Sequence, residues 1–365
     1  MAVEKMLILD NISLFQFRNY HSGSFSFSKN IIGFCGKNGS GKTNLLDAIY
    51  YLCFTKSYFN KPDAQNTSHG KTGFRIEGNL KKSGTPYKVV CVVRENGKKE
   101  FSVDREIYTK FAAHIGRFPC VMIAPDDVAI ITEASDERRK FIDYTISQLD
   151  LDYLHNLINY NKLLQQRNSL LKQAAEQGKM DETLFQVISA QLIQNGNLIF
   201  KKRQEFCRDF IPMIINLYNE IAKSNEKLSI NYISNLQSNT FEKILKENTT
   251  KDLALQRTTK GVHRDDLEFK IDGGLFKSLA SQGQRKSLLF ALKLAEYETL
   301  LQHKGFPPLM LLDDIFEKLD EDRMHNLLSR VCVKNQGQIF ITDTHCDRLN
   351  EALKRLDVQY QLFNL

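Results

Sequence analysis

The sequence lacks the features of a membrane or disulfide-framed protein. No apolar run approaches the ~20 residues that a membrane-spanning helix needs, and the N-terminal apolar run, broken by Asp10 and Asn11, is too short for a signal peptide. The seven cysteines contain no C-x-x-C pair, and their odd number and scatter predict free thiols in a reducing compartment. Internal repeats and low-complexity tracts are also missing. We therefore expect a soluble cytoplasmic protein with no membrane partner.

The bulk composition is that of an ordinary globular protein. With 365 residues the chain exceeds the usual limit for one hydrophobic core, so two lobes are expected. Hydrophobic residues make up 42% and charged residues 25%. The net charge of +7 favours a polyanionic partner only mildly.

One stretch fits G-x-x-x-x-G-K-[ST], the P-loop pattern: Gly36-Lys37-Asn38-Gly39-Ser40-Gly41-Lys42-Thr43. A short apolar run, 30–35, precedes it as a predicted buried strand, and residues 44–52 follow with helical spacing. Glycines let the backbone wrap a phosphate chain, with the N–H groups of the loop and helix start facing anionic oxygens. Lys42 is predicted to reach the β- and γ-phosphates, and Thr43 to hold Mg²⁺.

The rest of the chain predicts an α/β protein with a helical insertion. Apolar patterns predict strands over 6–17, 74–78, 87–93 and 119–124, and Phe25 and Phe27, which alternate with serines, predict another strand. Glu95-Asn96-Gly97-Lys98 predicts a type I′ hairpin turn. From about Ser135 to Ser224 the periodicity is helical throughout, with Ser135 or Asp136 as the first N-cap and Asp181 as a later one. Strand patterns return after residue 266.

Two further motifs follow the helical stretch. Leu309-Met310-Leu311-Leu312-Asp313-Asp314 has the pattern of a Walker B strand, so Asp313 is predicted to join the Mg²⁺ shell and Asp314 to orient the attacking water. Ser281-Gln282-Gly283-Gln284 opens a long amphipathic helix, where Ser281, Gly283 and Gln284 could contact a phosphate. In ABC-class proteins this signature meets the γ-phosphate of nucleotide held by a second subunit.

On these motifs the chain resembles the RecF family, within the SMC-like group of ABC ATPases, almost end to end. The matching segments are Phe17-Arg18-Asn19-Tyr20, the P-loop, Ala124-Pro125-Asp126-Asp127, 137–143, 166–168, Gly261-Val262-His263-Arg264-Asp265-Asp266-Leu267, 281–285, 311–314 and Leu319-Asp320. Val262 departs from the usual proline, and Lys56-Ser57-Tyr58-Phe59 replaces a Ser-His-Arg segment. No glutamine loop is identified. His345 is either a switch histidine or a surface histidine.

The resemblance implies a P-loop ABC-type ATPase head in two lobes with an inserted α-helical domain. The expected domains are 1–133 (Walker A lobe), 134–256 (mainly helical insert) and 257–365 (signature and Walker B lobe). It also implies ATP and Mg²⁺ as cofactors, an ATP-dependent homodimer, and weak, DNA-stimulated ATP hydrolysis used as a binding switch. The implied partners are duplex, single-stranded and gapped DNA, together with RecO and RecR, in recombination during DNA replication and repair.

Three other classes of protein fit the sequence less well. An SMC-type structural protein needs hundreds of heptad-patterned residues between the two nucleotide motifs, and this segment is far too short. An ABC transporter subunit, the main alternative, usually carries Leu-Ser-Gly-Gly-Gln. A nucleoside kinase needs an acceptor-pocket motif, which the sequence does not show.

Overall fold

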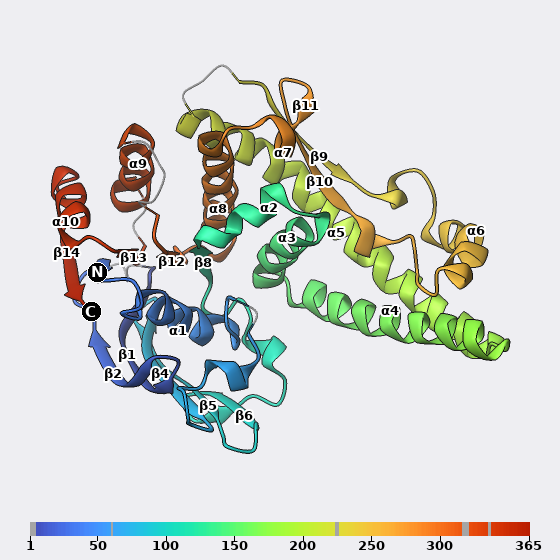
Figure 1. Ribbon diagram of the computed structural model, residues 1–365, viewed down its shortest axis with the longest axis horizontal. Helices are drawn as coiled ribbons and strands as arrows, with labels where there is room; N and C mark the ends of the chain where they lie inside the picture. The colour runs from blue at the N-terminus through green and yellow to red at the C-terminus, as the bar shows by residue number, and fades with distance from the viewer. Residues whose placement is uncertain (1–4, 60, 223–225, 316–320, 335–336) are drawn as a thin grey trace. The chain divides into compact units, whose positions relative to one another are not determined.

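The computed structural model describes residues 5–59, 61–222, 226–315, 321–334 and 337–365 (Figure 1). Contacts within the chain form two compact units. Unit 1 holds residues 1–128, 217–223 and 281–365, and unit 2 holds residues 129–216 and 224–280. The division at 133/134 and 256/257 stays a prediction, and in the contact pattern residues 257–280 group with the helical residues of unit 2. No helix among the described residues is long and apolar enough to cross a membrane.

The centre of unit 1 is a parallel sheet in the order β14-β3-β13-β12-β8. Its four strands β3, β13, β12 and β8 are short and fully buried, as expected when both faces of a parallel sheet are covered, whereas the edge strand β14 is only partly buried. The bounds are β3 (Ile31–Cys35), β8 (Cys120–Ile123), β12 (Leu309–Leu312), β13 (Ile339–Asp343) and the edge strand β14 (Tyr360–Asn364). The strand before the P-loop and the Walker B strand therefore flank β13, and their carboxyl ends lie at one edge of the sheet.

A second sheet of unit 1 is antiparallel, in the order β2-β1-β4-β5-β6-β7. Its strands are β1 (Leu7–Phe17), β2 (Tyr20–Ser26), β4 (Phe74–Lys82), β5 (Thr85–Val93), β6 (Lys99–Val103) and β7 (Glu106–Ile107). The predicted β5–β6 hairpin is confirmed, but the type I′ turn is wrong. Only Gly97 has a positive φ (75°), and its N–H donates to the Arg94 carbonyl, the pattern of a type I turn followed by a left-handed residue.

Helix α1 (Lys42–Phe54) packs against strands of both sheets and joins their cores (Figure 1). Leu45, Leu46 and Ile49 are fully buried in this common core. The other helices of unit 1 are α8 (Gln282–Lys304), α9 (Glu321–Leu328) with the π-helical turn η6 (Ser329–Lys334), α10 (Cys346–Arg355), and the 3₁₀ turns η1 (Asp63–Asn66), η2 (Phe111–His114) and η3 (Pro125–Val128).

Unit 2 confirms the helical stretch. Its long helices are α3 (Ser135–Leu149), α4 (Leu151–Gln177) and α5 (Glu182–Ala222). The last residues of α5, from 217 on, belong to unit 1. Asp181 caps α5 by accepting a hydrogen bond from the N–H of Leu184. The predicted cap of α3 is wrong, because Ala134 is the N-cap and no side chain caps that helix. The unit also contains α2 (Ala129–Thr132), α6 (Phe241–Ala254), α7 (Phe276–Leu279), η4 (Asn235–Gln237), η5 (Val262–Arg264) and the sheet β11-β10-β9, with β9 (Leu228–Ile233), β10 (Asp266–Ile271) and β11 (Gly274–Leu275).

Buried ion pairs bind the helices of unit 2 to the segment around residue 265. Arg203 of α5 contacts Asp265 at 2.8 Å and Asp143 at 2.9 Å, and Arg138 of α3 contacts Asp266 at 2.6 Å. Removing one partner of the fully buried Arg203–Asp265 pair leaves an uncompensated buried charge, which costs about 3–5 kcal/mol. The Asp265-Asp266 part of the family-specific run is therefore part of the packing of unit 2.

Candidate nucleotide-binding site

The P-loop connects β3 to α1 in a conformation that its glycines permit. Gly39 has φ 85° and Gly41 has φ 110°, in the left-handed region where a side chain is strained. At Gly41 a Cβ atom would also lie 2.5 Å from the Asn19 side chain. Gly41 is the N-cap of α1 and uses no side chain to cap it. The first N–H groups of α1 therefore have no partner within the helix and can face an anion.

Lys42 is only 4% exposed, and its ammonium is held by the loop itself. Its Nζ donates to the Gly36 carbonyl at 2.8 Å and to the Lys37 carbonyl at 3.1 Å. The buried Ser40 hydroxyl has no hydrogen-bond partner in the described part of the chain. A buried hydroxyl without a partner costs free energy, so the loop presents both a cation and an unsatisfied polar group to a phosphate chain.

The structure brings Thr43 and Asp313 together across 270 residues. The Thr43 hydroxyl donates to Asp313 Oδ1 at 3.0 Å, and the Thr342 hydroxyl donates to the same oxygen at 2.8 Å. The Asp313 N–H donates to the Ile123 carbonyl, so β8, β12 and β13 all position this carboxylate. The convergence of P-loop and Walker B strand predicted from the sequence is thus present in the fold, while Thr342 was not predicted.

Burial dominates the electrostatics of Asp313. It raises the pKa of this carboxyl from 3.8 to about 6, even though the Thr342 and Thr43 hydroxyls and the Lys42 charge act in the opposite direction. The neighbouring Asp314 carboxylate raises it further. Asp314 itself follows the strand with φ 44°, and its N–H donates to the Thr342 hydroxyl.

The segment Arg18-Asn19-Tyr20 braces the P-loop from the antiparallel sheet, a role that sequence reasoning missed. Asn19 donates to the Ser40 carbonyl at 3.1 Å, and the Tyr20 hydroxyl donates to the Gly41 carbonyl at 3.2 Å. Arg18 forms a buried ion pair with Asp47 of α1. These residues match the family by motif, but only the tertiary fold shows what they contact.

The signature motif lies at the start of α8, on the surface. Ser281 is the N-cap: its hydroxyl accepts from the Gln284 N–H at 3.2 Å, and the Gln284 side chain accepts from the Ser281 N–H at 2.6 Å. This capping box is the ordinary role of such a serine within one chain. Gln282 and Arg285 also line a cavity of about 340 Å³ with Asp313 and Asp314, so the helix start and the Walker B end share one space.

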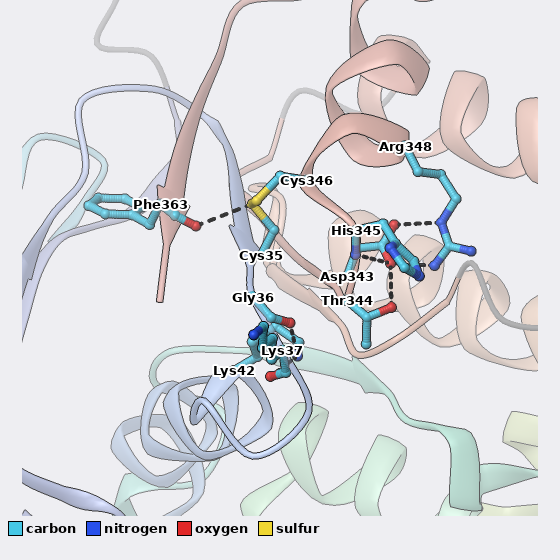
Figure 2. The surroundings of a disulfide bond; sticks show 10 residues. All are labelled: Cys35, Gly36, Lys37, Lys42, Asp343, Thr344, His345, Cys346, Arg348 and Phe363. Atoms are coloured by element: carbon cyan, nitrogen blue, oxygen red, sulfur yellow. Dashed lines mark hydrogen bonds and ion pairs between the residues drawn. A yellow bond between two sulfur atoms is a disulfide. The ribbon is translucent and has the colours of Figure 1, made fainter.

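A disulfide joins Cys35, the last residue of β3, to Cys346, the first residue of α10 (Figure 2). The prediction that all cysteines are free thiols is therefore wrong for this pair, whereas Cys53, Cys91, Cys120, Cys207 and Cys332 form no disulfide in the described part of the chain. The pairing escaped prediction because the two residues are 311 positions apart and meet only through the parallel sheet. The bridge ties the residue before the P-loop to the β13–α10 connection.

His345 is exposed beside this bridge. Its backbone N–H donates to Asp343 Oδ1 at 3.2 Å, and Asp343 also accepts from Arg348 at 2.8 Å. The switch role of His345 stays a prediction. Asp127, which the sequence left without a role, contacts Lys293 at 3.4 Å and accepts from the Ala124 N–H. Leu319 and Asp320 lie outside the described residues.

Comparison with known proteins assigns the chain to a family. The family model for the RecF/RecN/SMC N terminal domain matches residues 8–363. A protein of Flavobacterium johnsoniae named DNA replication and repair protein RecF is 43% identical over 98% of this chain and 99% of its own length. The chain belongs to the RecF family. A RecF protein of Cytophaga hutchinsonii is 42% identical over 98% of this chain and 94% of its own length.

Solved structures agree with this assignment. A recombination mediator protein RecF, described as RecF-ATPrS in the RecFOR pathway, superposes on this RecF-family chain with a TM-score of 0.89 at 29% identity, covering 100% of this chain and 98% of its own. The Smc head domain from Pyrococcus furiosus superposes with a TM-score of 0.56 at 14% identity, covering 96% and 92%. The second likeness shows the fold alone. The predicted fold class, an ATPase head of mixed α/β type, is confirmed.

Proposed function

We propose that this RecF-family chain is an ATP-dependent DNA-binding protein that acts as a recombination mediator in DNA replication and repair. The observation that carries the proposal is the contact of Thr43 with Asp313 beside the buried Lys42, because P-loop and Walker B residues must meet to form a nucleotide site. The similar RecF structures described with ATP and with ATPrS support ATP as the nucleotide.

The residues fit ATP with Mg²⁺. Mg²⁺ prefers oxygen ligands and takes one or two from the protein, and the Thr43 hydroxyl and Asp313 carboxylate supply one each. When bound, Mg²⁺ neutralises charge on the β- and γ-phosphates. Lys42 would leave the Gly36 and Lys37 carbonyls and donate to phosphate oxygens. The Ser40 hydroxyl and the first N–H groups of α1 complete the cradle.

Asp314 is proposed as the residue that orients the attacking water. Its backbone is fixed by the hydrogen bond from its N–H to Thr342, which in turn holds Asp313. We assign the two carboxylates separate tasks. Both line the cavity at the start of α8, and Asp313 in addition accepts a hydrogen bond from the Thr43 hydroxyl. Slow hydrolysis then acts as the release step of a binding switch.

ATP binding is proposed to join two copies of the chain, with Ser281, Gly283 and Gln284 of one copy completing the site of the other. The joined heads hold duplex and single-stranded DNA at gaps, work with RecO and RecR, and support recombinase loading. The RecF names of the relatives and the RecFOR pathway named for the similar structures support this assignment.

The direct test is ATP binding by Lys42→Ala. The phosphate oxygens lose the one P-loop side-chain cation that we assign to them, so affinity for a fluorescent ATP analogue should fall by at least tenfold. Lys88→Ala, which removes an exposed lysine of β5 outside the P-loop, is the matched control. Unchanged affinity in Lys42→Ala would overturn the site.

The main alternative is a transporter nucleotide-binding subunit. The two proposals predict different binding partners. A DNA-repair protein of this kind binds DNA when ATP is bound, whereas a transporter subunit is not expected to bind DNA. Retention of the protein on DNA-coated beads should increase with ATP and Mg²⁺. A protein retained equally with and without nucleotide would contradict the switch.

A further inference from the structure

Three basic residues of unit 1 lie near the amino ends of the parallel strands β8 and β12, far from the P-loop. Lys82 ends β4, Arg117 precedes β8, and Lys304 ends α8. The P-loop follows the carboxyl end of β3, whereas β8 and β12 begin beside Arg117 and Lys304. In a parallel sheet these are opposite edges, so this group is separate from the nucleotide site.

Aromatic rings hold the group in place. The Lys82 ammonium lies 5.7 Å from the ring centre of Tyr87, 5.8 Å from that of Phe118 and 6.0 Å from that of Phe306. The Arg117 guanidinium lies over the same Tyr87 and Phe118 rings, at 5.1 and 5.7 Å. Two cations therefore share two rings, within the ~6 Å range at which a ring face attracts a cation.

The backbone under Lys82 is also fixed. Ser83 (φ 49°) and Gly84 (φ 82°) form a two-residue turn between the paired Lys82 and Thr85, the geometry of a type I′ hairpin. Arg117 donates to the Tyr108 hydroxyl at 2.8 Å. Both charges are thus ordered before any ligand arrives, which lowers the entropy cost of binding.

The charges of the group are not neutralised. Among the described residues none of Lys82, Arg117 and Lys304 forms an ion pair, although the neighbouring Lys81 pairs with Asp10 and Lys88 pairs with Glu77. Burial lowers the pKa of Lys82, and the Arg117 charge lowers it further. Burial likewise lowers the pKa of Lys304, with the Lys82 charge as the second cause. Unbalanced like charges destabilise the fold unless an anion joins them.

We propose that Lys82, Arg117 and Lys304, with the rings of Tyr87 and Phe306, form a binding site for the phosphodiester backbone of single-stranded DNA. A strand backbone places one negative charge at each nucleotide, which matches cations drawn from three chain segments. The half-buried Tyr87 and Phe306 rings offer apolar surface to sugars and bases, the combination of cations and aromatic faces used by single-strand binding surfaces. The inference rests on the proposed DNA-binding function and names the surface that serves it.

The test is binding of fluorescent oligodeoxythymidylate to the full chain across a salt series. Each phosphate contact contributes about 0.7 to the slope of log K against log salt for a single strand. The triple variant K82Q/R117Q/K304Q, in which glutamine keeps part of each stem, should therefore reduce that slope by about 2 and weaken binding at least tenfold at low salt. Lys88→Gln is the matched control, because its charge on the adjacent strand is already paired, and its slope should stay near that of the wild type.

ATP affinity of the triple variant should equal that of the wild type, which shows that unit 1 is folded. A wild type that binds DNA with a slope that the triple variant shares would overturn this site but not the proposed function. A wild type that binds no DNA at any salt, with or without ATP, would overturn both. Polyglutamate should displace the oligonucleotide from the wild type and from Lys88→Gln only at a concentration far above that of competing DNA. If the wild type binds polyglutamate as tightly as DNA, an acidic protein segment is the ligand and the proposal is wrong.

Discussion

Asp313 shows how one residue can be placed for function at a cost in stability. Its pKa is about 6 in the folded chain, against 3.8 in the unfolded chain, because burial disfavours its charge. Between these values the folded state holds a proton that the unfolded state has released, so the free energy of unfolding falls as pH rises through this window. Above about pH 6 the full penalty applies, on the order of 2–3 kcal/mol at ~1.4 kcal/mol per pKa unit.

The raised pKa of Asp313 predicts how the stability of Asp313→Asn, whose side chain cannot titrate, differs from that of the wild type. Relative to the wild type, the variant should gain stability as pH rises from about 4 to about 6, and the gain should then stay constant. Urea unfolding of both proteins across this range, without nucleotide, measures the difference directly. A difference independent of pH would show that Asp313 is not a buried carboxyl with a raised pKa.

The two carboxylates at the end of β12 should also separate in function. Asp314→Asn keeps the Thr43–Asp313 contact, so ATP and Mg²⁺ binding should persist while hydrolysis falls, by roughly the 10²-fold or more typical of losing a general base. Asp313→Asn should instead weaken the Mg²⁺-dependent part of ATP binding. Equilibrium binding and steady-state hydrolysis of both variants check this. Wild-type hydrolysis rates in both would contradict the Walker B assignment.

At the scale of elements, the sequence predicted those helices, strands and turns that depend on residues close together in the chain. The P-loop with its strand and helix, the β5–β6 hairpin and the long helices of unit 2 follow from glycine spacing and periodicity. Strand β14 was not predicted, because this short edge strand exists only by pairing with β3. The contacts of Asn19 and Tyr20 with the P-loop, and of Thr342 with Asp313, were equally out of reach, since each joins segments brought together by the folded sheets.

The Cys35–Cys346 bridge is an element-scale feature with a testable effect. The two cysteines are 311 positions apart, and the chain-entropy relation assigns ~6 kcal/mol to closing a loop of this length. A reductant should therefore lower the thermal midpoint of the wild type, while Cys346→Ser should start from the lower midpoint and be insensitive to reductant. If alkylation labels both cysteines in the native, unreduced protein, the bridge is not formed.

At the scale of the whole molecule, the proposed nucleotide site is completed by a second copy of the chain. Within one chain the structure shows Ser281 only as a helix cap, with its hydroxyl on the Gln284 N–H. The motif order indicated a nucleotide site shared between subunits, but a surface serine shows no such partner until the second copy is present. The claim that the site is completed in trans therefore needs its own measurement.

That measurement is light scattering of Ser281→Arg with ATP and Mg²⁺. Arginine blocks close approach of the two copies but leaves the P-loop of each intact, so ATP affinity at low protein concentration should change little. Thr240→Arg, which removes the exposed N-cap of α6 in the same way, controls for the lost cap. We predict dimers for wild type and Thr240→Arg and monomers for Ser281→Arg, with hydrolysis and ATP-dependent DNA retention lost together. Ser281→Arg that dimerises and hydrolyses ATP like the wild type would contradict the shared site.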